Sequence, residues 1–154
     1  MYLEFIFIDL LLIHILFQLF YDFVDISPLN NINGINLIRT FKEKLFLSLL
    51  HALPSIMTLV LSLIYFGEVK PLGVGIFFLF YFATSLILIF LNWYVPYLWG
   101  TSETKKEIIE TEFKDTYQIL PQHRGNPRPN ALHVILHSLF LVNFFIMIRV
   151  GFIS

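Results

Sequence analysis

"NALHVILHSLFLVNFFIMIRVGF", residues 130–152, is a long apolar run whose single charged residue is Arg149. A helix needs roughly 20 mainly apolar residues to cross the hydrocarbon core of a bilayer, and this run is long enough. Three other stretches qualify on the same grounds, namely residues 2–24, 45–66 and 72–95. The sequence therefore predicts four membrane-spanning helices.

The composition agrees with a membrane protein and excludes a soluble domain. Of the 154 residues, 57% are hydrophobic and 14% are charged, whereas a soluble domain carries about 25% charged residues. A chain this short would leave much of that apolar surface in water. We predict an all-α protein: a single integral membrane domain over residues 1–154, folded as a four-helix bundle.

The same composition excludes several kinds of site and partner. The chain has no cysteine, which excludes disulfides, thiolate metal sites and cysteine nucleophiles. Its net charge of −1 gives no general attraction to nucleic acid. The first apolar run has no preceding basic residue and contains Glu4 and Asp9, so it is predicted to stay as a span and not to be cleaved as a signal peptide.

Basic residues predict the orientation. Eight of the ten Lys and Arg residues lie in two loops, residues 25–44 and 101–129. Because loop Lys and Arg favour the cytoplasmic side, both loops are predicted inside and both termini outside, in a multi-pass protein of the cytoplasmic (inner) membrane. Within the second loop, the helical spacing of Ile108, Ile109 and Phe113 predicts a short amphipathic cytoplasmic helix over residues 102–118, between the third and fourth spans.

Polar side chains recur along one face of each predicted span. Residues spaced three or four apart lie on one helical face. Such sets are His14, Gln18, Asp22 and Asp25; Ser48, His51, Ser55, Thr58 and Ser62; Tyr81, Ser85 and Asn92; and Asn130, His133 and His137. With the predicted orientation, the strongest polar groups of the four helices fall at similar depth. If the faces converge, they form a polar pocket that is open to the cytoplasm and has an apolar floor.

Two interpretations of these polar faces remain open. In the first, the pocket binds a metal ion or a small polar ligand; the candidate metal ligands are His133, His137, His51 and His14, and the candidate ligand-binding residues are His51, Asp22, Gln18, Asn92 and Asn130. Neutral imidazole is a common ligand of transition metals, and bis-histidine haem ligation is a weaker alternative. In the second, the polar groups only hydrogen-bond the helices to one another.

The class of function is equally open at this point. Metalloprotease chemistry of the H-E-x-x-H type needs Glu beside the first histidine, and residue 134 is Val. No nucleophile with a matching base is identifiable, which favours a non-enzymatic protein. The alternative to a ligand-binding protein is a homo-oligomeric or partner-binding membrane subunit, which could form a pore and in which the polar faces are packing contacts.

The acidic residues of the loop helix have two interpretations as well. They are Glu103, Glu107, Glu110, Glu112 and Asp115. Such a run could supply carboxylates to a site below the pocket. The favoured interpretation is the solvated face of a surface helix.

Three segments carry a resemblance to known proteins. They are "WYVPYLWG" (93–100), "EFKDTYQILP" (112–121) and "RPNALHVILH" (128–137). Together they resemble a group of small bacterial membrane proteins with the pattern P-Y-x-x-G, then F-x-x-T with L-P, then P-N-x-L-H-x-x-L-H. The resemblance implies a bacterial four-helix membrane protein and no particular activity. Tyr117 stands where that group is expected to have histidine after the threonine, which would remove one ligand from a metal site.

Overall fold

The computed structural model describes residues 2–152, and within that range it is helical and contains no strand. Four segments are long and apolar enough to cross a membrane: Tyr2–Phe20, Phe41–Ile64, Leu72–Trp99 and Ala131–Phe152. The elements are α1 (Tyr2–Phe20), α2 (Ile32–Ile38), α3 (Phe41–Ile64), α4 (Leu72–Ile89), the π-helical turn η1 (Phe90–Tyr94), α5 (Val95–Trp99), α6 (Glu103–Glu112) and α7 (Ala131–Phe152). The all-α class predicted from the sequence is confirmed, and the chain is a small polytopic membrane protein.

Local capping explains where the first two spans differ from their predicted bounds. The first span ends at Phe20 because the Asn30 side chain hydrogen-bonds the carbonyl groups that follow it. Its amide nitrogen donates to the carbonyl oxygens of Tyr21 (3.0 Å) and Val24 (2.7 Å). The second span begins at Phe41, four residues earlier than predicted. There Thr40 and Glu43 form a reciprocal capping box that satisfies the first turn of α3.

The third span and the loop helix differ for similar reasons. The third continues beyond residue 95 because η1 inserts a π turn and Pro96 lies in the first turn of α5, where proline is tolerated. The loop helix α6 covers Glu103–Glu112 and stops well before residue 118. It is followed by Asp115, whose positive φ of 61° leaves the helical region.

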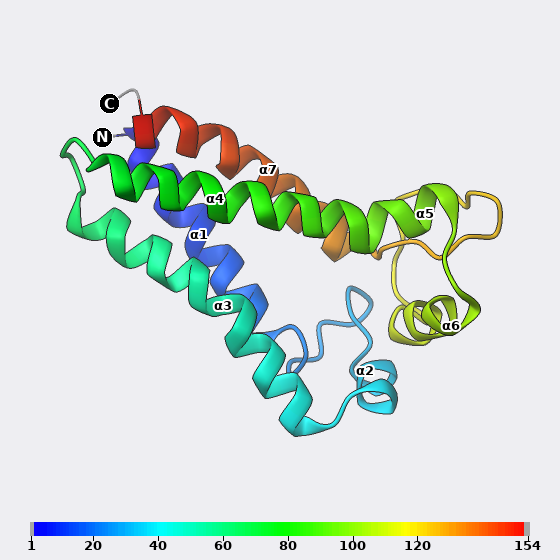
Figure 1. Cartoon of the computed structure of the whole chain (residues 1–154). Helices are drawn as coiled ribbons and strands as arrows, with labels where there is room; N and C mark the ends of the chain where they lie inside the picture. The colour runs from blue at the N-terminus through cyan, green and yellow to red at the C-terminus, as the bar shows by residue number, and fades with distance from the viewer. Residues whose placement is uncertain (1, 153–154) are drawn as a thin grey trace.

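The long helices pack in the order α3, α1, α7, α4 (Figure 1). Helix α1 packs against both α3 and α7, and α7 packs against α4, whereas α3 and α4 touch only marginally. The two outer helices meet near their connecting turn and diverge towards the other end of the bundle (Figure 1). The bundle is therefore open on one side.

The two ends of the bundle differ in structure. At the end that holds both termini, called here the terminal end (Figure 1), aromatic and aliphatic side chains fill the space between the helices: Phe7, Leu11, Phe78, Phe82, Phe140 and Met147. A buried ion pair closes this end, with Lys70 Nζ 2.9 Å from Glu4 Oε1. The backbone N–H of Gly67 donates to the same Glu4 oxygen (3.3 Å).

The opposite end, called here the loop end, carries a layer made of residues 21–40 and 100–130. Hydrogen bonds between its two halves hold this layer together: Asn31 Nδ2 donates to the Lys114 carbonyl (2.8 Å), and the Tyr117 N–H donates to the Pro28 carbonyl (2.8 Å). Helix α2 lies so close to α6 that a Cβ at Gly34 would clash with the Thr111 carbonyl oxygen. The loop layer is thus a packed unit seated on the open end of the bundle.

Candidate functional site

A buried ionic network joins the loop layer to the end of α1. Arg39 Nη2 lies 3.0 Å from Glu112 Oε2, and its Nη1 contacts both carboxylate oxygens of Asp22 at 3.4 Å. The exposed fractions of the Glu112 and Asp22 side chains are 3% and 10%. One guanidinium thus bridges two buried carboxylates, a geometry suited to its planar fork of donors.

Burial is the strongest influence on the pKa of Glu112 in this network. Burial raises the pKa of Glu112 to about 7, although the Arg39 guanidinium opposes the rise and the Asp22 carboxylate adds to it. Tyr21, also buried beside the network, has its pKa raised by burial and by the charge of Glu112. Asp22 and Glu112 therefore share the Arg39 guanidinium, while the buried Lys44 ammonium donates to the Asp22 backbone carbonyl (3.2 Å).

His133 is held in one tautomer by Asn130, the residue before α7. The Asn130 amide nitrogen donates to the Leu29 carbonyl (2.7 Å) and towards the Tyr21 hydroxyl (3.4 Å), which assigns its oxygen as the acceptor. That oxygen accepts the His133 backbone N–H (3.0 Å) and faces ring Nδ1 at 2.8 Å. His133 therefore carries its proton on Nδ1, and Nε2 is left with a lone pair.

Aromatic rings enclose His133. The ring centroids of Tyr21, Trp93 and Phe113 lie 4.8, 4.7 and 5.0 Å from that of His133. The π turn η1 helps to form this enclosure because it brings the consecutive residues Trp93 and Tyr94 both towards α7. The ring centroids of Tyr94 and His137 are 5.8 Å apart. π turns of this kind occur often at functional sites.

His137 lies one turn further into the bundle, with its ring centroid 5.7 Å from that of His133. Its Nδ1 is buried and has no hydrogen-bond partner within residues 2–152. The ring borders a cavity of about 210 Å³ between α4 and α7, together with Tyr94 and Ser138. A hydrogen-bonding atom at this depth is thus left without a protein partner.

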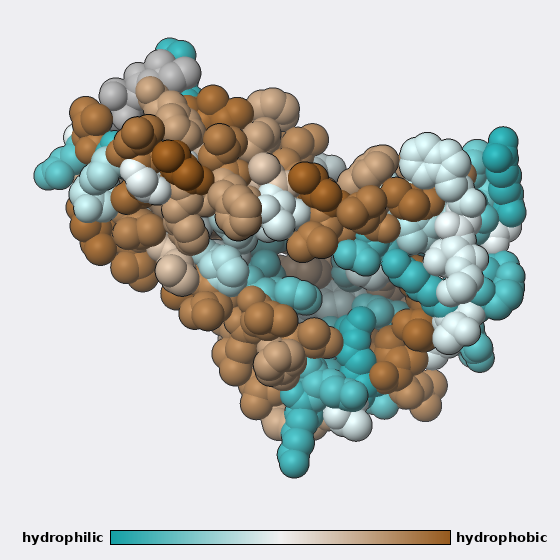
Figure 2. All heavy atoms as spheres, in the orientation of Figure 1, coloured by the Kyte–Doolittle hydropathy of each residue, from teal (hydrophilic) through white to brown (hydrophobic). Residues whose placement is uncertain are grey.

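A second polar group of residues connects α1, α3 and α4. The Ser55 hydroxyl donates to Gln18 Oε1 (2.8 Å) and hydrogen-bonds the Tyr81 hydroxyl. Beside this contact α3 and α4 diverge, and Figure 2 shows hydrophilic residues within a hollow that hydrophobic surface borders on both sides. We call this the loop-end hollow.

Two further histidines, His14 and His51, lie near the same hollow. His51 is exposed, is within electrostatic range of Asp22 and Arg39, and lies one turn before Ser55 on the same side of α3, which is the side of the hollow. His14 is within electrostatic range of His51 and of His137, and its ring is tilted by 35° to that of Phe140, with 4.6 Å between the ring centroids. The histidines approach one another only in pairs. Across residues 2–152 no three His, Cys, Asp or Glu side chains lie close enough together to hold a metal ion.

The structure brings some of the predicted site residues together and separates others. Asn130 and His133 are hydrogen-bonded, Gln18 bonds Ser55 and Asp22 bonds Arg39. Asn92 is exposed, and its side chain donates to the Leu88 carbonyl of its own helix (3.0 Å). Asn92 therefore does not join the others, because the π turn and the splay of α4 point it outwards.

Three residues of this region were not predicted from the sequence. From the sequence, Arg39 is one of several loop cations, Glu112 belongs to an acidic run interpreted as a solvated face, and Trp93 has no predicted role in the site. Glu112 is in fact 2% exposed, so the solvated-face interpretation is wrong for this residue. The available signal was its spacing of three from Ile109, which places it on the buried face of α6.

Comparison of the chain with protein families, with curated proteins and with solved structures gave no match.

Proposed function

We propose that this chain is a non-enzymatic membrane protein that binds a small amphiphilic ligand in the loop-end hollow. The observation that supports the proposal is the exposure of polar side chains at membrane depth where α3 and α4 separate (Figure 2). His51 lies about 15 Å along α3 from its first residue, at about 1.5 Å per residue. Polar groups at such depth are costly in lipid and are commonly found at functional sites.

The hydrogen-bonding groups around the hollow are only partly satisfied by the protein. Ser55, Gln18 and Tyr81 bond one another. His14 and His51 make no hydrogen bond through their rings within residues 2–152. A ligand with a polar end would complete these groups, and an apolar end would lie between the hydrophobic faces of α3 and α4.

The tautomer of His133 supports a second form of the same proposal, in which a transition metal ion is bound. Metal-binding histidines usually donate their other ring N–H to a fixed acceptor, and His133 does so to Asn130. His137 is the adjacent imidazole. Among residues 2–152 no third His, Cys, Asp or Glu side chain lies close enough to complete a metal site, so the amphiphile is the favoured occupant.

The proposed orientation places the loop end in the cytoplasm and both termini outside. It is supported by the concentration of Lys and Arg in the two long loops. The hollow would then be open to the cytoplasmic half of a bacterial inner membrane. In that setting the ion pair at the terminal end lies on the outer side and blocks a path across the bundle.

Native mass spectrometry of the protein in lipid nanodiscs tests the proposal. Wild type should retain a small molecule that the double variant Gln18→Leu/His51→Leu loses, while the lipid-facing control Met57→Leu keeps it. Elemental analysis of wild type and of His133→Ala/His137→Ala tests the metal form, which predicts near-stoichiometric metal in wild type alone. If neither occupant is found and the mass is that of an oligomer, the polar faces are packing contacts and the proposal is wrong.

A further inference from the structure

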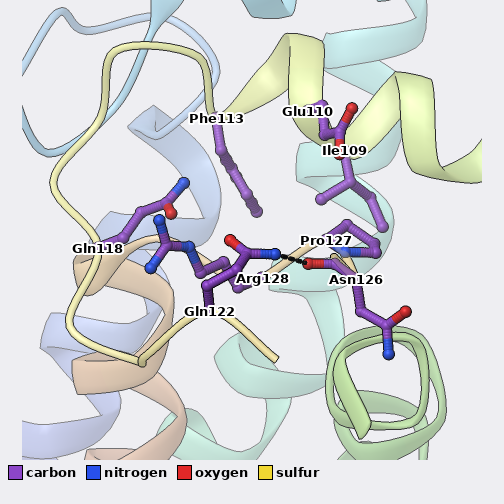
Figure 3. Close-up of a pocket in the computed structure, with 8 residues that line it drawn as sticks. All are labelled: Ile109, Glu110, Phe113, Gln118, Gln122, Asn126, Pro127 and Arg128. Atoms are coloured by element: carbon purple, nitrogen blue, oxygen red, sulfur yellow. Dashed lines mark hydrogen bonds between the residues drawn. The ribbon is translucent and has the colours of Figure 1, made fainter. Parts of the chain in front are cut away.

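Two cavities of about 210 Å³ differ in how their polar groups are satisfied. One lies in the loop layer, between α6 and the segment that leads into α7 (Figure 3). There Gln122 Nε2 donates to the Asn126 carbonyl (2.9 Å) and Arg128 Nη1 donates to the Leu120 carbonyl (2.8 Å), so polar side chains of the lining hold the loop itself. The other lies between α4 and α7 beside His137, whose ring has no such partner. We call it the lateral cavity.

The lateral cavity is open to the side of the bundle that faces lipid. Phe90, Ser138 and Leu141 line it, and all three are exposed. His137 is six residues from Ala131, which places it about 9 Å along α7 from the loop end, at about 1.5 Å per residue. A ligand that is dissolved in the bilayer can therefore enter this cavity sideways.

His137 presents one hydrogen-bond donor to the cavity. Its Nδ1 is buried without a partner within residues 2–152, whereas Nε2, also without a partner there, remains accessible. A buried N–H without an acceptor is rarer in proteins than a buried acceptor without a donor, which assigns the proton to Nε2. Because His137 lines the cavity, this Nε2–H is available to an acceptor that the cavity holds.

The other lining groups limit the chemistry of the ligand. None of the residues that line the lateral cavity is charged, so an ionic ligand would lie in the membrane without a counter-ion, which is costly. The Ser138 hydroxyl already donates to the Val134 carbonyl (2.8 Å). Phe90 and Tyr94 supply aromatic walls, and aromatic side chains pack well against a flat ring. A neutral ring that carries a hydrogen-bond acceptor fits these groups.

We propose that the lateral cavity binds the head ring of an isoprenoid quinone. One quinone carbonyl oxygen accepts the Nε2–H of His137, the ring packs against Phe90 and Tyr94, and the isoprenoid tail extends into the lipid past Leu141. The site lies on the α7 side of α4, whereas the loop-end hollow lies between α3 and α4. The inference therefore does not depend on what the hollow binds.

A tryptophan beside the cavity provides the readout. The ring centroid of Trp93 is 6.3 Å from that of His137. The chain has two tryptophans, so Trp99→Phe leaves Trp93 as the single fluorophore. Quinones quench indole emission at short range, so a quinone bound beside His137 should quench Trp93.

The test titrates decylubiquinone, a short-tailed quinone, into the Trp99→Phe protein in nanodiscs. We expect saturable quenching of Trp93, matched by about one quinone retained per protein after the nanodiscs are repurified and extracted. His137→Leu in the same parent should weaken binding roughly three- to tenfold, because one hydrogen bond is lost. His137→Gln keeps an N–H donor and should recover part of that loss.

A second pair of variants tests the location of the site. Ser138 is exposed, so Ser138→Phe should leave the fold intact while its ring fills the cavity and abolishes saturable binding. His51→Leu, which alters the loop-end hollow, is the control and should bind as the parent does. If His51→Leu alone lost the quinone, the quinone would be a ligand of the hollow, and the lateral site would be wrong while the proposed function stood.

A lipid of different chemistry tests the choice of ligand. Dioleoylglycerol carries a hydroxyl group and no ring, and it should not compete with decylubiquinone. Quenching that rises linearly without saturation, or equal competition by dioleoylglycerol, would overturn the proposal. Binding by His137→Leu equal to that of the parent would do the same; if that variant does not fold, undiminished binding by Ser138→Phe is the result that decides against the site.

Discussion

The two ends of α1 pair buried charges in different surroundings. At the terminal end Glu4 meets Lys70 across 2.9 Å within a closed bundle packed with phenylalanine. At the loop end Asp22 and Glu112 share Arg39 beside an open hollow. The first ion pair lies in an aromatic interior, whereas in the second two carboxylates share one guanidinium and the Lys44 ammonium donates to the Asp22 backbone carbonyl.

The connections between the helices account for this difference. A short turn, residues 65–71, joins α3 to α4 and keeps them together at the terminal end. At the loop end no short connection joins them, and the loop layer lies between their ends. Closure at one end and opening at the other therefore follow from loop length, although all four long helices are similarly apolar.

The largest expected effect is that of Arg39→Met. Removing the shared cation leaves two buried carboxylates without a partner, and breaking a buried ion pair in this way costs about 3–5 kcal/mol. We expect a large drop in the thermal unfolding midpoint in detergent, with detachment of the loop layer visible as faster hydrogen exchange in α6. Arg124→Met, at an exposed position, is the control; an equal drop in both variants would show that the network contributes nothing specific.

The second-largest loss of stability is expected on removing the buried ion pair at the terminal end. Lys70→Met leaves Glu4 in a site from which water is excluded and should lower the unfolding free energy by about 3 kcal/mol. The double variant Glu4→Gln/Lys70→Met should recover much of that loss, because neither residue then carries a charge. Detergent unfolding of the four proteins of this cycle measures the coupling, and additive single effects would contradict a direct interaction.

A smaller effect of opposite sign is expected inside the closed half. Asn143 is 1% exposed, and neither of its side-chain polar atoms has a hydrogen-bond partner within the described residues. Because an unsatisfied buried amide costs about 1–3 kcal/mol, Asn143→Leu should stabilise the protein by about 1 kcal/mol or more. The unfolding midpoint should rise; a fall would contradict the assignment of Asn143 as an unsatisfied buried amide.

A pH dependence is expected at the loop end. The pKa of Glu112 is about 7 in the folded chain, raised from an ordinary value of 4.5 by burial. Between these two values the folded state keeps a proton that the unfolded state has lost, so the contribution of Glu112 to stability falls as pH rises from about 4.5 to about 7. The midpoint of wild type minus that of Glu112→Gln should decline over this window; a difference that rises with pH would contradict the assignment.

Much of the fold was predictable because lipid imposes a strong rule on sequence. A spanning helix must be long and apolar, so Phe41–Ile64 and Ala131–Phe152 were evident within a few residues. The loop helix was predictable from the spacing of its apolar residues. Capping at Thr40 and Asn30 then decided the bounds, and such local hydrogen bonds are hard to infer from periodicity alone.

The site was less predictable because it depends on contacts between distant residues. Arg39 and Glu112 are far apart in sequence, and no periodicity shows that one is the partner of the other. The order of helices around the bundle, and with it the opening between α3 and α4, leaves no signal in a single sequence. The π turn that brings Trp93 to His133 also changes the helical phase in a way that a regular period does not anticipate.

The central claim is that the interior of the bundle is open and polar at the loop end and closed at the terminal end. Because the chain has no cysteine, single cysteines at His51, Leu50 and Ser62 can be compared by their labelling rate with a charged, water-soluble maleimide in nanodiscs. His51 faces the hollow, Leu50 is 52% exposed towards lipid, and Ser62 is 3% exposed. We predict rapid labelling of His51→Cys and slow labelling of Leu50→Cys and Ser62→Cys. Equal rates for His51→Cys and Leu50→Cys would contradict the claim that the hollow is a polar site.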